Sequence, residues 1–268
     1  MKLLLLTGSH PRHLYLVNKM AELGIVAAHI IEIRGSFVPT PPIGLEDIDR
    51  ENFIRHFSDR DEAEHSHFAG NEHINVEIPT LKVSMQNLNS PETMEWVATQ
   101  QFDLAISYGV HKLSNELLSV MPEHSWNIHG GLSPWYKGNT TLFWPFFMLR
   151  PNWAGMTIHR LTERLDAGGI VHHSVPELAY GDGLHDVACK AVTQVTEDLS
   201  KIISELSLEE IKYVTQKGNG KIWVGVDWLP QHLRFVYNTY NNDIVDQFLD
   251  GKLPKLDPPL ISAFCKGE

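Results

Sequence analysis

The chain has 268 residues, enough for one large domain with its own hydrophobic core. Its formal net charge of −11 argues against a nucleic-acid partner, because nucleic-acid affinity depends largely on Lys and Arg displacing counterions. Two cysteines without paired spacing, Cys189 and Cys265, support neither a disulfide framework nor a zinc knuckle, and they fit a reducing cytoplasm.

The first residues are expected to form a buried strand rather than a targeting signal. In MKLLLLTGSHPRH, polar Thr7 and Ser9 cut the apolar run short of a signal-peptide core. No apolar stretch of the sequence approaches the roughly 20 residues that a membrane span needs. We therefore expect a cytoplasmic protein that contacts no membrane.

The first half of the chain alternates between apolar runs and helical periodicity. Residues 2–7 and 25–33 predict strands buried on both faces, and residues 13–24 between them predict a helix that ends at Gly24. This β-α-β opening predicts a parallel sheet. The next elements are expected to be a helix, a strand, a helix and a strand at residues 52–70, 73–79, 90–101 and 102–107.

The sheet is expected to continue before the pattern changes. Further strands are predicted at residues 125–129, 155–161 and 169–175. An amphipathic helix follows from about Gly183 to Leu206, with Asp182 as its N-cap.

The C-terminal region differs from the rest in its pattern. Residues 218–228 predict a β-hairpin or strand, and residues 231–251 predict a final helix. A boundary near Asn219 divides the chain into a main domain, residues 1–218, and a small β/α extension, residues 219–268.

One short stretch places polar side chains together at a strand end. In WNIHGGLSPWYKG, Asn127 and His129 are two residues apart, so in a strand they project from the same face. A solvated edge strand entering a turn is the plain alternative. Downstream, RLDAGGI sets Asp166 before a turn. We expect these three side chains to converge at the carboxyl edge of one parallel sheet, where open α/β sheets bind ligands.

The same stretch carries a resemblance to a known family. NIHGGLSPWYKGNTTLFWP, followed by AGMTIHRLTERLDAGGI, resembles the 10-formyltetrahydrofolate-dependent formyltransferases, whose pattern is Asn-x-His, Leu-x-Pro-x-Tyr-x-Gly, and Thr-x-His leading to Asp-x-Gly. The match spans roughly Tyr108 to Val171 and departs at Gly130-Gly131, where many relatives carry Pro-Ser. It implies an α/β, Rossmann-like fold with a mostly parallel sheet, helices on both faces and a small C-terminal appendage.

The resemblance implies catalytic roles for the three side chains. Asn127 and His129 would donate hydrogen bonds to the oxyanion that forms when an amine attacks the formyl carbonyl. Asp166 would set the protonation state of His129 and help to move the proton from the amine to the folate nitrogen. The implied cosubstrate is 10-formyltetrahydrofolate. No metal is implied, and the scattered histidines show no metal-ligand spacing.

The folate is expected to lie across SYGVHKLS, residues 107–114, for which an ordinary strand-to-helix connection is the alternative. By resemblance, the residues that contact the cosubstrate are Tyr108, Val110, His111, Lys112, Leu113 and Asp166.

Three acceptor classes occur in this family: a glycinamide ribonucleotide, initiator tRNA and a nucleotide-linked amino sugar. The tRNA enzymes usually append a basic domain of about 100 residues, whereas here about 50 residues follow Gly218 and the chain is acidic. The layout favours a sugar N-formyltransferase acting on a GDP- or dTDP-linked 4-amino-4,6-dideoxysugar for O-antigen in lipopolysaccharide, with GDP-perosamine first. The alternatives are methionyl-tRNA or glycinamide ribonucleotide formylation, or a non-catalytic folate- or nucleotide-binding module.

Two segments are predicted to contact the acceptor. TGSHPRH offers backbone N–H groups, a helix N-terminus and an arginine to a diphosphate, with a plain helix cap as the equal alternative. WYKG offers two aromatic rings and a lysine to a sugar or base, with simple packing as the alternative for Trp135. The predicted acceptor contacts are Gly8, Ser9, Arg12, Trp135, Tyr136 and Lys137.

The C-terminal extension also predicts an oligomer. Ile222, Trp223, Val224, Val226 and Trp228 form a more apolar stretch than a short exposed hairpin normally presents to water. We therefore expect a homodimer joined through this segment.

Overall fold

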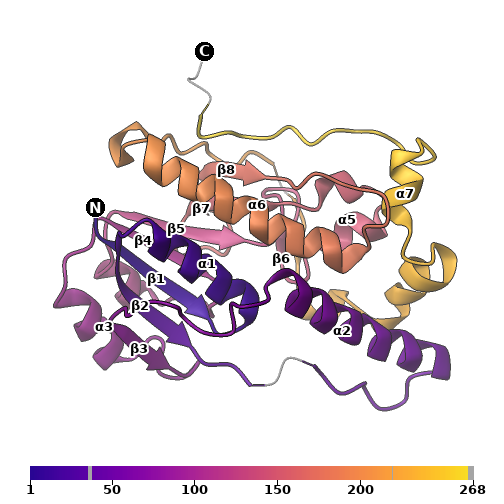
Figure 1. The fold of residues 1–268 in the computed structure, drawn as a ribbon, viewed down its shortest axis with the longest axis horizontal. Helices are drawn as coiled ribbons and strands as arrows, with labels where there is room; N and C mark the ends of the chain where they lie inside the picture. The colour runs from indigo at the N-terminus through magenta and orange to yellow at the C-terminus, as the bar shows by residue number, and fades with distance from the viewer. Residues whose placement is uncertain (36–37, 219, 265–268) are drawn as a thin grey trace.

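The computed structural model of the protein describes residues 1–35, 38–218 and 220–264. A sheet of seven strands lies at its centre, in the order β3-β2-β1-β4-β5-β7-β8, with helices on both faces (Figure 1). The strands span Leu3–Gly8 (β1), Val26–Glu32 (β2), Thr80–Val83 (β3), Leu104–Tyr108 (β4), His124–His129 (β5), Met156–Arg160 (β7) and Ile170–Ser174 (β8). β1 to β5 run parallel, whereas β7 is antiparallel to both β5 and β8. This mostly parallel sheet confirms the predicted fold class.

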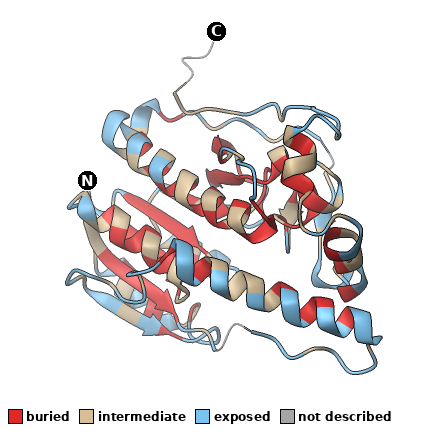
Figure 2. Ribbon diagram, turned by 45° about the vertical axis from the view of Figure 1, so that its right-hand side comes forward, coloured by how far each residue is buried: buried red, intermediate tan, exposed pale blue. Residues whose placement is uncertain are grey.

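Alternate residues of the central strands pack against different helical layers. The helices are α1 (Pro11–Glu22), α2 (Asp47–His67), α3 (Pro91–Ala98), α4 (Asn115–Ser119), α5 (Trp144–Phe147), α6 (Leu184–Glu205) and α7 (Ile244–Leu249). Leu3 and Leu5 of β1 pack in one core with α1 and α6, while Leu4 and Leu6 pack in another with α3 and α4. Figure 2 shows these strands as the buried centre of the molecule. None of the helices in the described residues is both long enough and apolar enough to cross a bilayer.

One predicted strand is wrong. Residues 73–79 form bends, and the strand begins only at Thr80. The side chain of Asn18 explains the delay, because its amide donates to the carbonyl of His73 and accepts from the backbone N–H of Asn75. The backbone of this segment is therefore bound to α1, and pairing with β2 starts where Pro79 accepts from His29.

The predicted C-terminal hairpin or strand is a strand of two residues. β9 (Ile222–Trp223) pairs in parallel with β6 (Lys137–Gly138), and a 3-10 turn at Gly225–Asp227 follows it. The predicted boundary at Asn219 lies outside the described residues, as does Cys265.

The predicted final helix is broken into three pieces. These are a 3-10 turn at Pro230–His232, a π-helical turn at Phe235–Thr239, and α7. Asn241 and Asn242 adopt φ values of 49° and 62°, the left-handed region that asparagine tolerates better than most residues. The Asn242 side chain then accepts from the backbone N–H of Leu184, the first residue of α6.

The start of α6 therefore differs from the prediction. Its N-cap is Gly183 rather than Asp182, and a side chain from the C-terminal region binds the first backbone N–H of the helix. Asp182 instead accepts from the backbone of Ala179 and pairs with Lys190, 2.6 Å away.

The C-terminal segment shares a hydrophobic core with the main body. Leu233, Val236 and Ile244 belong to the same buried cluster as Phe143 and Trp144. The ring of Trp223 also stacks on Trp144, with centroids 3.9 Å apart and planes at 15°.

Because of this packing, only part of the segment predicted to form the dimer interface is exposed. Trp223 and Trp228 pack against the shared core, whereas Ile222, Val224 and Val226 are exposed. The homodimer remains a prediction. The exposed apolar surface that supports it is smaller than the sequence indicated, because the two tryptophans pack inward.

Replacing Trp223 with alanine removes this ring stack. We expect the free energy of unfolding to fall by about 2–3 kcal/mol, because partly buried aromatic surface is lost and a cavity remains. Urea titration followed by circular dichroism measures the change. Val226→Ala, at a position that is 83% exposed, is the control. A Trp223→Ala protein as stable as the control variant would contradict the proposed packing role.

Candidate active site

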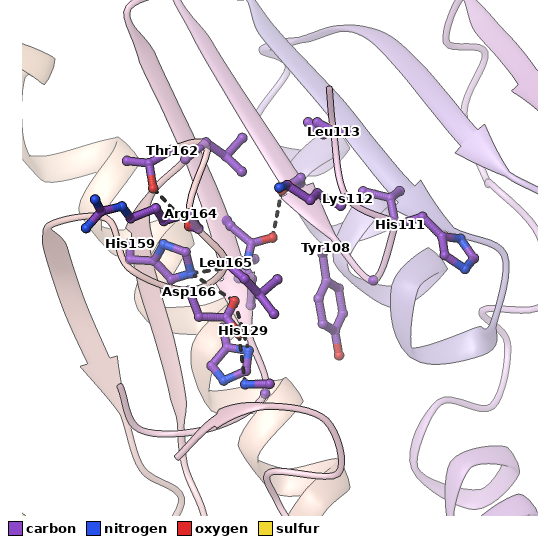
Figure 3. Close-up of a pocket in the computed structure, with 18 of the residues that line it drawn as sticks. Tyr108, His111, Lys112, Leu113, His129, His159, Thr162, Arg164, Leu165 and Asp166 are labelled. Carbon is purple, nitrogen blue, oxygen red and sulfur yellow. Dashed lines mark hydrogen bonds and ion pairs between the residues drawn. The ribbon is translucent and has the colours of Figure 1, made fainter. Parts of the chain in front are cut away.

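The main cavity, of about 530 Å³, lies where β4 and β5 end (Figure 3). One of its walls is the loop that follows β4, and the side chains of Asn127 and His129 come from β5. Its lining includes every residue predicted for catalysis and for the cosubstrate: Tyr108, Val110, His111, Lys112, Leu113, Asn127, His129 and Asp166. The structure thus brings together side chains that are up to 58 positions apart, from 108 to 166.

Hydrogen bonds fix the amide of Asn127. Its oxygen accepts from the hydroxyl of Ser107 at 2.7 Å, and its nitrogen lies 3.2 Å from Nε2 of His159, directly opposite on β7. Nδ1 of His159 lies 2.9 Å from the carbonyl of Arg160, and its Nε2 lies near both the Asn127 amide and Oδ1 of Asp166. His159 stands in the Thr-x-His stretch of the family pattern, but sequence reasoning assigned it no role.

Asp166 reaches the cavity by an unexpected route. Because β7 is antiparallel to β5, the turn that carries Asp166 follows the end of β7 at the amino end of β5. The three side chains converge beside the end of β5, but Asp166 comes there from a turn near the other end of that strand. The turn folds back over the sheet with Asp166 at φ 46°, and Gln216 holds the backbone carbonyls of Asp166 and Gly168, each at 2.8 Å.

The carboxylate of Asp166 then lies between two imidazoles. Oδ1 is 3.5 Å from Nδ1 of His129 and 3.6 Å from Nε2 of His159, while Oδ2 accepts from the backbone N–H of Gly138 at 2.9 Å. Figure 3 shows both imidazoles directed at this carboxylate. Burial raises the pKa of Asp166, but these partners outweigh it, so the net pKa lies below its usual range. The group is an anion at neutral pH.

His129 is uncharged at neutral pH. Its Nε2–H donates to the carbonyl of Tyr136 at 2.9 Å, and Nδ1 faces Asp166. Burial lowers the pKa of His129 below 6.5, and the neighbouring carboxylate of Asp166 offsets only part of that shift. The result is a neutral base whose open nitrogen faces a carboxylate, so a proton that arrives at Nδ1 is stabilised there.

Glu32 anchors the loop that forms the opposite wall. This buried carboxylate at the end of β2 accepts from the backbone N–H of His111 at 2.8 Å and pairs with Arg34 at 3.2 Å. Gly109 has φ 71° and approaches His13 so closely that a Cβ would lie 2.1 Å from Nε2. Neither Glu32 nor Arg34 was predicted, because nothing in their local sequence indicates contact with a loop 77 or more residues away.

A second cavity, of about 320 Å³, adjoins the first. The two share a wall made of Tyr108, Gly109, His129, Gly130 and Gly138. The polar side chains that line only the second cavity include Arg12, His13, His56, Arg60, Glu64 and His185. His129 therefore faces both spaces.

Of the residues predicted to contact the acceptor, only some lie beside a cavity. Arg12 lines the second cavity and pairs with Glu64. Gly8 and Ser9 line neither cavity. Gly8 packs against His13, and the hydroxyl of Ser9 accepts from the backbone of Arg34 at 3.1 Å.

Three residues of the WYKG segment, Trp135, Tyr136 and Lys137, line neither cavity, whereas Gly138 lies in the shared wall. Trp135 packs edge-on against Trp153 with ring centroids 5.3 Å apart, so packing is the arrangement the structure shows. Tyr136 is buried in the hydrophobic cluster that also contains Phe143 and Trp144, and its backbone carbonyl accepts from His129. Lys137 belongs to β6. In the described parts of the chain, no group of three or more His, Cys, Asp or Glu side chains is arranged to hold a metal ion.

Residues 48–203, more than half of the chain, match the Formyl transferase family. The chain belongs to the formyl transferase family. This confirms the enzyme class that the Asn-x-His and Asp-x-Gly stretches indicated.

Solved structures of other formyltransferases share the fold. A sugar N-formyltransferase from Shewanella is 14% identical, with 88% of this chain and 87% of that chain covered and a TM-score of 0.56. A phosphoribosylglycinamide formyltransferase from Anaplasma phagocytophilum is 16% identical, with 83% and 96% covered and a TM-score of 0.55. The formyltransferase PseJ from Anoxybacillus kamchatkensis, in complex with UDP-4,6-dideoxy-4-formamido-L-AltNAc and tetrahydrofolate, is 16% identical, with 90% and 95% covered and a TM-score of 0.50.

Proposed function

We propose that this formyl transferase moves a formyl group from 10-formyltetrahydrofolate to the amine of a nucleotide-linked amino sugar. The observation that carries the proposal is the wall shared by the two cavities, with His129 in it. A donor and an acceptor bound on either side reach the same imidazole. Direct transfer between two small molecules needs this arrangement, because the reacting atoms must be held about 3–3.5 Å apart.

The larger cavity suits the folate. Val110, Leu113 and Leu118 give its wall apolar surface for the pterin, and the loop backbone offers polar groups to the ring edges. Arg34 and Arg164 line the same cavity and suit the carboxylates of the glutamate tail. PseJ was solved with tetrahydrofolate, which supports this assignment.

The smaller cavity suits a phosphorylated amine. Two guanidiniums, from Arg12 and Arg60, line it, and guanidinium is the side chain best matched to phosphate oxygens. PseJ was solved with a UDP-linked formamido sugar, so a nucleotide-linked amino sugar is the first acceptor class to test. GDP-perosamine and dTDP-linked sugars, with a role in O-antigen synthesis, remain the specific proposal. The net charge of −11 disfavours tRNA.

Asn127, His129 and Asp166 have different roles in the proposed reaction. As the amine nitrogen bonds to the formyl carbon, the amide of Asn127 stabilises the charge that develops on the formyl oxygen. His129 takes the proton that the amine gives up, at Nδ1, where Asp166 stabilises the imidazolium. The same proton passes to the folate nitrogen as its bond to the formyl carbon breaks. Because Nε2 of His129 is held by the carbonyl of Tyr136, Nδ1 is the nitrogen available for this transfer.

An acceptor panel tests the function. The purified protein would be supplied with 10-formyltetrahydrofolate and, separately, with GDP-perosamine, dTDP-4-amino-4,6-dideoxyglucose, a UDP-linked 4-amino sugar, glycinamide ribonucleotide and methionyl-tRNA. We expect formylation of one or more nucleotide sugars. Mass spectrometry would detect the product by a mass increase of about 28 Da, because replacing an amine hydrogen with a formyl group adds CO. Formylation confined to glycinamide ribonucleotide or to methionyl-tRNA would contradict the proposed acceptor class.

His129→Asn and Asp166→Asn test the catalytic assignment. Each change should lower kcat by about 100-fold or more, because proton transfer in the transition state is lost. The Kd of tetrahydrofolate, measured by calorimetry, should stay within about threefold of the wild-type value. His65→Asn, on the exposed face of α2, is a matched control that keeps wild-type turnover. Near wild-type kcat in either site variant would remove that residue from the mechanism.

The pH dependence of kcat reports the ionisation of His129. A base acts only when unprotonated, so activity is present above its pKa and is lost as the pH falls through it. Because burial lowers the pKa of His129, the acid limb of kcat should lie below pH 6.5. The Asp166 charge raises that pKa, so the residual activity of Asp166→Asn should show a limb at still lower pH. A limb that moves to higher pH in this variant would exclude His129 as the titrating base.

A further inference from the structure

Three polar side chains from distant parts of the chain meet at the edge of the smaller cavity, which two of them line. Nδ1 of His56, on α2, lies 2.9 Å from the hydroxyl of Tyr237 and 3.2 Å from Nε2 of His185, on α6. The Tyr237 hydroxyl is also 3.4 Å from Nε2 of His185. Their exposed fractions are 5%, 6% and 3% for His56, His185 and Tyr237. We call these three residues the His-His-Tyr cluster.

Tyr237 links this cluster to the C-terminal segment. His56 and His185 line the cavity and fall within the residues that match the family, 48–203, whereas Tyr237 lies beyond them in the π-helical turn. Asn52 also binds Asn238 of the same turn at 2.7 Å, so side chains of α2 hold the turn at two neighbouring positions.

Both imidazoles of the cluster are uncharged at neutral pH. Burial, together with the charge of Arg60, lowers the pKa of His185 to about 3. Burial, helped by the charge of Arg60, also holds the pKa of His56 well below 6.5. The cluster therefore offers hydrogen bonds rather than charge, in the cavity where Arg12 and Arg60 supply the positive charge.

One polar atom of the cluster is left for a ligand. The contacts within the cluster use Nδ1 of His56, and among the described residues Nε2 of His56 has no hydrogen-bond partner. Nε2 is not one of the fully buried side-chain atoms that lack a partner, so it remains accessible from the cavity that His56 lines. His56 lines the smaller cavity, so a bound acceptor supplies that partner.

We propose that Nε2 of His56 selects the acceptor by a hydrogen bond to a hydroxyl of its sugar, and that Tyr237 is the positioning residue that sets this contact. A hydroxyl both donates and accepts, so it satisfies His56 in either tautomer, whereas a phosphate only accepts and an ammonium only donates. The inference rests on the proposed function, because it assigns a subsite within the acceptor cavity. It makes the C-terminal segment part of acceptor recognition.

Tyr237→Phe tests this assignment with little change in packing. The substitution removes only the hydroxyl, and the ring keeps its place in the core beneath the guanidinium of Arg55, which lies 4.5 Å from the ring centroid. With the nucleotide sugar that wild-type protein formylates in the panel, we expect KM for the sugar to rise about tenfold. We expect kcat and the KM for 10-formyltetrahydrofolate to stay within about twofold, because the catalytic residues are untouched.

Acceptor analogues that each lack one sugar hydroxyl distinguish a positioning role of Tyr237 from a purely structural one. The measured quantity is KM for each analogue. For the analogue that lacks the contacted hydroxyl, Tyr237→Phe and wild-type protein should have equal KM values. Tyr240→Phe, three residues further along and packed on Phe235, is the matched control and should leave every constant unchanged.

Each result has a defined consequence. If wild-type protein formylates a nucleotide sugar and Tyr237→Phe has the same KM for it, the inference is overturned and the proposed function stands. An equal loss in kcat and in both KM values, together with a lower Tm, would make Tyr237 structural and would also overturn it. If wild-type protein formylates no nucleotide sugar, the proposed function fails and the inference fails with it.

Discussion

The architecture depends on keeping one buried carboxylate charged. Asp166 is only 6% exposed, and an isolated ion at that depth would protonate instead of staying charged. Its charge persists because the backbone N–H of Gly138 donates to Oδ2 and the imidazole of His159 lies 3.6 Å from Oδ1. Each compensating group is itself held by a different part of the chain, so the charge links regions that are remote in sequence.

The C-terminal segment is one of those regions. Gly138 has φ 91°, and a Cβ at this position would lie 2.1 Å from the carbonyl oxygen of Trp223. The same oxygen accepts from the backbone N–H of Asn139 at 2.8 Å, which pins the chain beside the N–H that Asp166 needs. Stacking of Trp223 on Trp144 fixes β9, so an aromatic contact in the appendage helps to orient a backbone donor in the site.

Local sequence patterns predicted the parts of the fold that depend on local periodicity. Apolar runs located β1 and β2, helical spacing located α6, and the Asn-x-His and Asp-x-Gly stretches located the three side chains around the main cavity. The failures come from long-range contacts, and two of them come from side chains that bind distant backbone. Asn18 binds residues 73 and 75 and delays β3, and Asn242 binds the start of α6 and interrupts the predicted last helix. The reversed direction of β7 is likewise set by pairing, which period-2 alternation does not encode.

The wall between the two cavities contains three glycines, Gly109, Gly130 and Gly138. Glycines place no side chain between the two spaces beside His129. A single inhibitor that joins a pterin-like half to a phosphorylated half through a short linker would occupy both spaces at once. Because binding of the first half raises the effective concentration of the second, such a bisubstrate compound would bind more tightly than either half alone.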